Sequence, residues 1–375
     1  MNWKLKYSLV VLGLVVVLAG VYAVSERGTV NEPSKLDHDP SSQLSKMLKS
    51  AHGGNVQADI SLGLLYYRGR GVSQSYIKAI SWFKKAAGKN DVMAEYLVGK
   101  SYYFQGNFSH SLVWSKKAAN QNYAPAETLL SFMYSEGQGV IKSTGESLYW
   151  NKKAAIQGFA IAEWNLSDDY YKGDGFPINY AEAAYWARKS ARQHFVLAET
   201  ALGGLYASGY GVPKNYAKAL SWWEKAAKQG DVLSEILIGS LYIQGKGVPE
   251  NGLEAEFWFK KAIAQSCSNE EQHPGLRRLS VEFSKKRGCV NAELSLGMIY
   301  LDGAKKVIKN YPKAIPLLMD AAKRGSGQAD YNLGESYYHG WGVPQNSLTA
   351  IKWFKRAEKK DIPKAGVQIY EIENH

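Results

Sequence analysis

The sequence predicts an all-α protein, an α-solenoid superhelix of eight helix-turn-helix repeats. One motif recurs along the 375-residue chain, mostly at intervals of about 36 residues. Inside each copy, small and apolar residues recur every four positions, the spacing of one face of an α-helix. A glycine-rich turn divides most copies into two halves. Because one helix pair cannot bury its apolar face alone, the copies are expected to stack.

The composition is that of a folded protein. Apolar residues make up 45% of the chain and aromatic residues 13%, which excludes a disordered chain. Two cysteines exclude a disulfide-dense small domain and a zinc site of four cysteines. The histidines lack metal-binding spacing, so we expect no metal and no cofactor. The formal net charge is +12, but no base-reading motif is present, and nucleic acid is not an expected partner.

The chain opens with an apolar stretch over residues 7–24, preceded by two lysines. A basic start, an apolar core and a small residue at Ala23 are typical of a secretory signal peptide. The stretch is also long enough for an uncleaved membrane anchor. We therefore expect residues 1–24 to be a signal peptide or anchor. Residues 25–40 are expected to be a linker, and the body of the protein to be exported, either periplasmic or secreted.

The repeats follow over residues 41–375, with a half-repeat at each end. Their first helices start at about Ala58, Ala94, Ala126, Ala162, Ala198, Ser234, Ala292 and Ala329. In most copies a Gly-x-Gly turn supplies the positive φ angles that end this helix. Glycine also lies inside the first helix, where it costs ~1 kcal/mol relative to alanine. We expect a tryptophan of the second helix, such as Trp82 or Trp222, to fill the space so created.

This motif resembles the Sel1-like repeat family, relatives of the tetratricopeptide repeats, over roughly residues 41–370. The resemblance implies an α-solenoid that binds other proteins and rarely catalyses a reaction. An exported chain with eight such repeats also resembles a Legionella protein of host-cell invasion and vacuole trafficking. That second resemblance implies host proteins as partners. A scaffold of the producer's own envelope, periplasmic or membrane-anchored, is the alternative.

Three departures from the motif stand out. The second repeat is four residues shorter than its neighbours and lacks Gly-x-Gly. The seventh has Leu317 in the tryptophan position beside Pro316, so its second helix is expected to be strained or to start late. An insertion at about residues 266–287 separates repeats six and seven. Cys267 and Cys289 bracket it, and we expect either a disulfide that clamps an extra helical hairpin or two buried small residues.

Catalytic motifs are weak. The Gly-x-Gly stretches follow helices rather than strands, so they are turns and not phosphate loops. Ser81 and Lys84 match the S-x-x-K motif of penicillin-handling enzymes, but the chain has no Ser-Asp-Asn or Lys-Thr-Gly partner motif. Asp168 and Asp169 are adjacent on a helix and point to different faces, which does not suit a shared acid/base pair. We expect no catalytic residue, with a penicillin-handling enzyme as the remaining enzymatic alternative.

Pairs of basic residues recur at one place on the second helix of six repeats. These basic pairs are Lys84-Lys85, Lys116-Lys117, Lys152-Lys153, Arg188-Lys189, Lys260-Lys261 and Lys355-Arg356. Stacking would align them as a positive ridge. Either they complement helix C-termini and remain solvated, or the ridge attracts acidic proteins or anionic membrane lipid.

The resemblance to tetratricopeptide repeats implies that the first helices line a concave groove. The groove set predicted on that basis is Tyr67, Arg68, Tyr96, Lys100, Tyr103, Phe104, Phe132, Trp164, Asp168, Tyr171, Lys172, Tyr331, Tyr338 and His339. Aromatic residues with Arg and Lys are typical of interface hot spots. Trp164 lies off the repeat motif, so it is not expected to serve the core between repeats. The alternative is that these rings are buried between repeats.

Overall fold

A computed structural model describes residues 40–175, 177–267 and 279–374. These residues form 18 helices and no β-strand. The predicted leader, the linker up to residue 39 and part of the insertion lie outside the described residues. No helix among the described residues has the length and apolarity needed to cross a membrane. The chain divides into two compact units, and the boundary between Ala198 and Glu199 falls inside α11.

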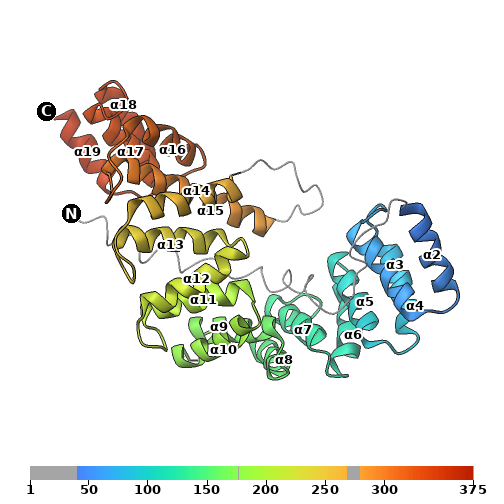
Figure 1. Ribbon diagram of the computed structural model, residues 1–375. Helices are drawn as coiled ribbons and strands as arrows, with labels where there is room; N and C mark the ends of the chain where they lie inside the picture. The colour runs from blue at the N-terminus through green and yellow to red at the C-terminus, as the bar shows by residue number, and fades with distance from the viewer. Residues whose placement is uncertain (1–39, 176, 268–278, 375) are drawn as a thin grey trace. The chain divides into compact units, whose positions relative to one another are not determined.

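Each repeat is a pair of helices joined by a turn, as predicted. The helices are α2 (Pro40–His52), α3 (Val56–Arg68), α4 (Tyr76–Ala87), α5 (Val92–Phe104), α6 (Phe108–Ala119), α7 (Ala124–Glu136), α8 (Thr144–Ile156), α9 (Ala160–Lys172), α10 (Tyr180–Arg192), α11 (Val196–Ser208), α12 (Tyr216–Lys228), α13 (Val232–Gln244), α14 (Gly252–Ser266), α15 (Leu279–Asp302), α16 (Tyr311–Lys323), α17 (Gly327–His339), α18 (Ser347–Glu358) and α19 (Lys364–Glu373). Repeat 1 is α3 with α4, and repeat 8 is α17 with α18 (Figure 1). Helices α2 and α19 are the flanking half-repeats. The all-α solenoid prediction is confirmed.

The Gly-x-Gly turns need glycine for two different reasons. The first glycine ends the helix in the left-handed region: Gly69 has φ 71°, and its N–H donates to the Leu65 carbonyl over 2.8 Å. The second glycine lies against the preceding repeat, where a Cβ on Gly139 would lie 2.8 Å from the backbone of Phe108. In repeat 7 the glycine at this contact belongs to the preceding repeat instead of to the turn. It is Gly252 of α14, whose N–H donates to the Lys305 carbonyl over 2.8 Å and where a Cβ would lie 2.6 Å from that oxygen.

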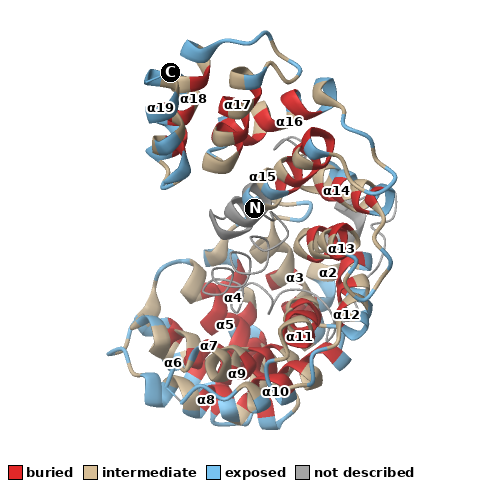
Figure 2. Ribbon diagram, turned by 90° about the vertical axis from the view of Figure 1, so that its left-hand side faces the viewer, coloured by how far each residue is buried: buried red, intermediate tan, exposed pale blue. Residues whose placement is uncertain are grey.

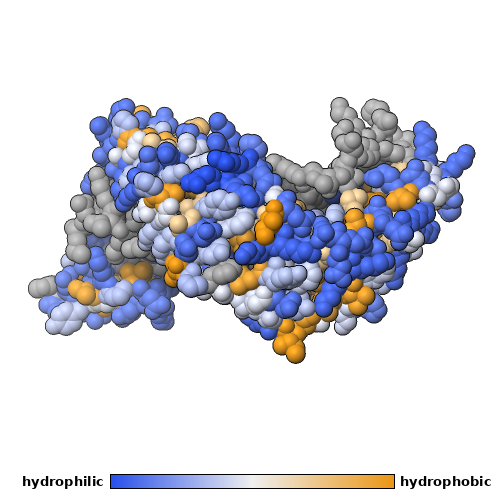
Figure 3. Space-filling view, turned by 90° about the horizontal axis from the view of Figure 1, so that it is seen from below, coloured by the Kyte–Doolittle hydropathy of each residue, from blue (hydrophilic) through white to orange (hydrophobic). Residues whose placement is uncertain are grey.

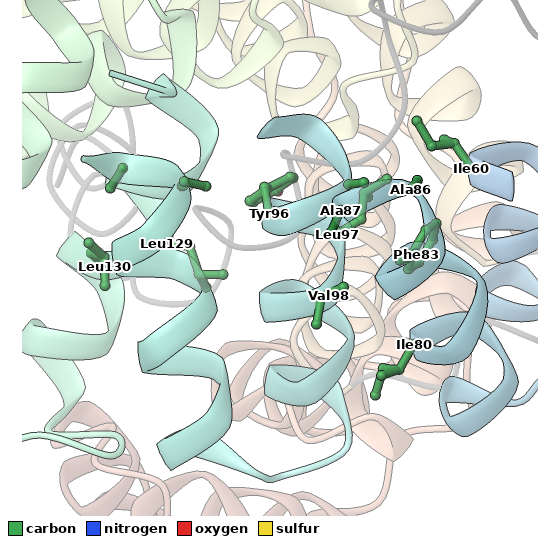
Figure 4. Packing of buried hydrophobic residues seen from close by; sticks show 14 of the residues in the cluster. Ile60, Ile80, Phe83, Ala86, Ala87, Tyr96, Leu97, Val98, Leu129 and Leu130 are labelled. Carbon is green, nitrogen blue, oxygen red and sulfur yellow. The ribbon is translucent and has the colours of Figure 1, made fainter. Parts of the chain in front are cut away.

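The residue that fills the space beside the helix glycine is not the predicted tryptophan. It is the next residue along the second helix: a Cβ on Gly63 would overlap the ring of Phe83, and one on Gly203 the ring of Trp223. Phe83 is fully buried within the cluster shown in Figure 4, whereas Trp82 is half-buried. The prediction that the tryptophan position fills this space is therefore wrong.

Buried residues concentrate on the inner helices of the repeats, whereas the flanking helices α2 and α19 carry few of them (Figure 2). In repeats 3 and 4 the helix glycine is replaced by Ser131 and Ser167. The facing residues are small there, Asn151 and Ala187 instead of an aromatic ring. An aromatic ring lies opposite the helix glycine in repeats 1, 5, 6 and 8, whereas Ser115 and Leu318 lie there in repeats 2 and 7. The residue after the tryptophan position thus fills the space between paired helices in each case.

Repeat 7 departs from two expectations. Helix α16 starts at Tyr311 with Asn310 as its N-cap, although Pro316 lies inside it. A late start is therefore wrong. The described part of the insertion extends α15 at its N-terminal end as one continuous helix, rather than forming a separate hairpin. The structure joins Cys267, at the end of α14, to Cys289 of α15 by a disulfide.

A candidate partner-binding face

Every repeat buries one carboxylate on its first helix, near the helix start in all repeats except the seventh, where α15 is extended at its N-terminal end. These eight residues are Asp59, Glu95, Glu127, Glu163, Glu199, Glu235, Glu293 and Asp330, and none is more than 4% exposed. Sequence reasoning missed them, although each directly follows the small residue used to mark its repeat. A buried carboxylate must be paired or hydrogen-bonded to remain charged. The cations that pair with these carboxylates are therefore needed for the fold, and most of them belong to the basic pairs.

In five of the six basic pairs, the second member neutralises this carboxylate. In repeat 1 the cation is Lys89, outside the pair, whose Nζ lies 3.4 Å from Asp59 Oδ2. Lys153 Nζ lies 3.1 Å from Glu127 Oε1 and donates to the carbonyl of Ala119, the last residue of the preceding repeat's second helix, over 3.4 Å. Gln157 Nε2 donates to the other carboxylate oxygen over 2.6 Å. Lys261 repeats this arrangement with Glu235 in the C-terminal unit. The ammonium thus ties together two consecutive repeats.

The predicted positive ridge is consequently reduced to the first members of the pairs. Second members lie over the tryptophan rings, with Lys189 Nζ 4.8 Å from the centre of the Trp186 ring. Some first members are also engaged: Lys84 Nζ donates to Tyr102 Oη over 2.9 Å. The ammonium in the S-x-x-K motif is therefore directed to a tyrosine.

Part of the predicted groove set is buried between repeats. Trp164, at 6% exposure, packs against Phe195 with ring centres 5.8 Å apart. Tyr96 packs in the same way against Tyr123, and burial raises its pKa well above the usual value. The expectation that Trp164 lies outside the core between repeats is wrong, because this position contacts the residue that precedes the next helix pair.

Repeat 4 has a polar junction instead of an exposed binding surface. Asp168 pairs with Lys172 over 2.8 Å, within one turn of α9. Asp169 accepts from Asn151 Nδ2 over 3.3 Å. Burial, helped by the charges of Asp168 and Asp174, raises the pKa of Asp169 to about 7. Tyr171 lies beside Tyr180, with ring centres 5.5 Å apart.

That pKa predicts a pH dependence of stability. The folded state holds a proton on Asp169 that the unfolded chain releases at a lower pH, so lowering the pH from 8 to 5.5 should stabilise the fold. Replacing Asp169 with Asn should remove roughly 1–2 kcal/mol of that gain. Urea unfolding of both proteins at the two pH values measures this. An unchanged pH dependence in the variant would contradict the assignment.

Six aromatic residues of repeats 1–3 form a continuous surface of half-buried rings. We name this surface the aromatic face; it consists of Tyr67, Tyr76, Tyr103, Phe104, Phe108 and Phe132. Phe104 connects its two halves, with ring centres 6.0 Å from Tyr67 and 5.4 Å from Tyr103. Tyr103 in turn lies 5.4 Å from Phe108 and 6.0 Å from Phe132. All six lie where a first helix ends or a second helix begins.

Polar and charged groups border the aromatic face. Lys100 is buried, and its Nζ lies 5.7 Å from the centre of the Tyr67 ring, in reach of a cation–π interaction. Tyr103 Oη donates to Gln138 Oε1 over 2.6 Å, and burial raises the pKa of Tyr103 to about 12, so the phenol stays protonated. Arg68 ends α3, and Arg70 is exposed in the turn that follows.

A hollow of about 540 Å³ adjoins the aromatic face at Phe108. Its lining residues are Gln105, Gly106, Asn107, Phe108, Ser109 and Gly139. The hollow lies at the short turn of repeat 2, where the longer Gly-x-Gly turn of other repeats is missing. The shortened repeat thus opens space next to exposed ring surface. Elsewhere, apolar side chains form separate patches on a mostly hydrophilic surface (Figure 3).

The C-terminal unit holds the remaining members of the groove set. Tyr338 and His339 are neighbours at the end of α17, with ring centres 4.9 Å apart. His339 stacks on Trp341 at 4.5 Å. Tyr331 packs against Phe354 of the core. This cluster is smaller than the aromatic face and belongs to the other compact unit.

One group among the described residues has the spacing of a metal site. The ligand atoms of Cys267, Cys289 and Glu293 lie within 4.8 Å of one another. The two sulfur atoms are bonded to each other, and Arg324 donates two hydrogen bonds to the Glu293 carboxylate. A disulfide does not supply thiolate ligands. In this form the group connects three helices: the disulfide joins α14 to α15, and Arg324 at the end of α16 binds Glu293 of α15.

The match of a family model to each of the eight repeats identifies the family of this chain. The Sel1 repeat model matches residues 56–91, 92–123, 124–159, 160–195, 196–231, 232–267, 290–326 and 327–361, more than half of the chain. The chain belongs to the Sel1 repeat family. Repeats of this family suggest a scaffold for protein–protein interactions, and the family is generally not catalytic.

Two solved Sel1 repeat structures are similar to this chain. One is c5321, described as a protective antigen present in uropathogenic Escherichia coli strains, with 26% identity and a TM-score of 0.54 over 88% of this chain and 82% of that one. The other is a Sel1 repeat protein from Oxalobacter formigenes, with 23% identity and a TM-score of 0.58 over 94% and 99%. No curated protein matches the chain. The resemblance to one particular Legionella protein is not supported.

Proposed function

We propose that this Sel1 repeat protein is an exported adaptor that binds host proteins through the aromatic face of repeats 1–3. The observation that carries the proposal is the six half-buried rings in contact, with Lys100 in cation–π reach of Tyr67 and a hollow beside Phe108. Rigid aromatic rings bury a large contact area at a small cost in conformational entropy, which makes them frequent interface hot spots.

Two further observations support export and host partners. The apolar stretch over residues 7–24 has the pattern of a signal peptide or anchor. The similar Escherichia coli protein is described as a protective antigen, which is consistent with exposure to a host. Since the second member of most basic pairs is engaged with a buried carboxylate, anionic lipid is a weaker candidate partner than a protein.

Replacing Phe104 and Phe132 with Ala should abolish partner capture. Each hot-spot ring contributes about 1–2 kcal/mol, so the double variant should lose at least tenfold in affinity. Because both rings are half-buried, each truncation should cost only about 1 kcal/mol, so the double variant should remain folded at the assay temperature. Affinity capture from host-cell and producer lysates, run in parallel, measures the effect. Capture only from the producer lysate would favour the envelope scaffold instead.

A matched control comes from the outer surface of the same unit. Tyr149 and Tyr185 are 57% and 49% exposed on second helices. The Tyr149→Ala/Tyr185→Ala variant removes the same number of rings and should keep the partner. If this control loses the partner while the Phe104→Ala/Phe132→Ala variant retains it, the aromatic face is not the binding surface.

A further inference from the structure

Residues 25–39 of the predicted linker join α2 at Pro40, and Pro40 lies at the same edge of the repeats as the aromatic face. Helices α2 and α3 have equal length, pack together and are joined by a short turn containing Gly54, so they run antiparallel. The N-terminal end of α2 at Pro40 is therefore level with the end of α3 at Tyr67 and Arg68. In the repeat frame, Pro40 is equivalent to Tyr76, the first residue of α4.

The linker is long enough to cover this face. Residues 25–39 span up to about 50 Å when extended, at ~3.3 Å per residue. The aromatic face covers three consecutive repeats whose packed helices lie about 10 Å apart, so roughly 20–30 Å separates its ends. A segment that leaves Pro40 at the edge of repeat 1 can therefore reach Phe132 with residues to spare.

The chemistry of the linker complements that of the face. Residues 25–39 carry four acids against two bases and include apolar residues at Val30, Pro33 and Leu36. The face offers aromatic ring surface together with Lys100, and Arg70 is exposed in the adjoining turn. An acidic extended segment with spaced apolar side chains is the kind of ligand that such a surface accommodates.

We propose that residues 25–39 fold back onto the aromatic face as an intramolecular ligand, which a partner must displace. This inference rests on the proposed function for its regulatory meaning. A partner can bind only while the face is uncovered, so its apparent affinity is the intrinsic affinity multiplied by the uncovered fraction. The packing itself requires no partner. It can therefore be tested on the purified protein alone.

The test places the photo-crosslinking residue p-benzoylphenylalanine at Phe104 of the full chain. After illumination, peptide mass spectrometry of the monomer should find adducts within residues 25–39. The same residue at Tyr149, on the outer surface, is the control and should give at least tenfold fewer such adducts. Adducts absent from residues 25–39, equal at both positions, or found only between isotope-labelled and unlabelled copies would overturn the proposal.

Charge variants sharpen the test. Glu32→Gln with Asp37→Asn should lower the adduct yield at least threefold, whereas Arg27→Gln should not lower it. An unchanged yield in the first variant would overturn the charge complementarity on which the proposal depends. The two proposals fail separately. If adducts form but the Phe104→Ala/Phe132→Ala variant still captures the partner, only the binding function is rejected. If that variant loses the partner but no adducts form, only the intramolecular ligand is rejected.

Discussion

Replacing Lys153 with Met should lower the free energy of unfolding by about 3 kcal/mol, the lower end of the range for breaking a buried ion pair. The substitution leaves the fully buried carboxylate of Glu127 without its cation and removes the hydrogen bond to the Ala119 carbonyl. The hydrogen bond from Gln157 remains and limits the loss. Urea unfolding followed by circular dichroism measures the change.

The neighbouring residue supplies the control. Lys152 is exposed, and Lys152→Met should change stability by no more than about 0.5 kcal/mol. Adding Glu127→Gln to Lys153→Met should recover much of the loss, because the uncompensated charge is gone. Burial already raises the pKa of Glu127 and Lys153 lowers it, so the variant's deficit should shrink as the pH falls from 7 towards 5. Equal losses in the Lys152 and Lys153 variants would contradict a structural role for the second basic residue.

Replacing Trp223 with Ala should cost about 3–5 kcal/mol, as for other large core truncations. Trp223 is 4% exposed, fills the space beside Gly203, and donates through its indole N–H to the Thr200 carbonyl over 3.0 Å. Truncation therefore leaves a cavity and removes the second hydrogen bond to a carbonyl that lies inside α11. Thermal and urea unfolding report the loss.

Its neighbour Trp222 provides a matched comparison of the same side chain. Trp222 is half-buried, and its ring lies 3.8 Å from Lys225 Nζ. Its truncation removes a cation–π contact and some packing, so Trp222→Ala should cost only about 1 kcal/mol. If Trp222→Ala were the more destabilising substitution, the assignment of the core position would be reversed.

The helix pairs could be predicted because their signals are local. Glycine at a left-handed position ends a helix whatever surrounds it, and Gly69, Gly137 and Gly245 all have positive φ. The alanine, leucine and tyrosine at helical spacing indicated the first helix independently of the second. Repetition then made the stacking of neighbouring pairs a physical necessity.

The details of packing depend on contacts that spacing alone does not specify. Trp222 and Trp223 are adjacent on a helix and point about 100° apart, so a modest rotation of the helix decides which one faces Gly203. Trp164 looked free because it is off the motif. It is buried because Phe195, the last residue of the same repeat, packs against it.

The candidate site was only partly predictable for the same reason. Tyr67, Tyr103, Phe104 and Phe132 were expected in the groove and lie on the aromatic face. Tyr76 and Phe108 were not predicted, because they start second helices, whereas the resemblance to tetratricopeptide repeats implied groove residues on first helices only. A usable signal was present, since aromatic residues occupy this start in repeats 1, 2, 4, 5 and 7.

Hydrogen–deuterium exchange of the full chain with and without a captured partner tests the central claim most directly. If the aromatic face binds the partner, amide protection should increase at residues 66–76, 102–108 and 132–139, the ends and turns that carry its six rings. The outer surfaces of α8 and α10 should exchange at unchanged rates. Protection confined to those outer helices, or to the cluster around Trp341, would contradict the account.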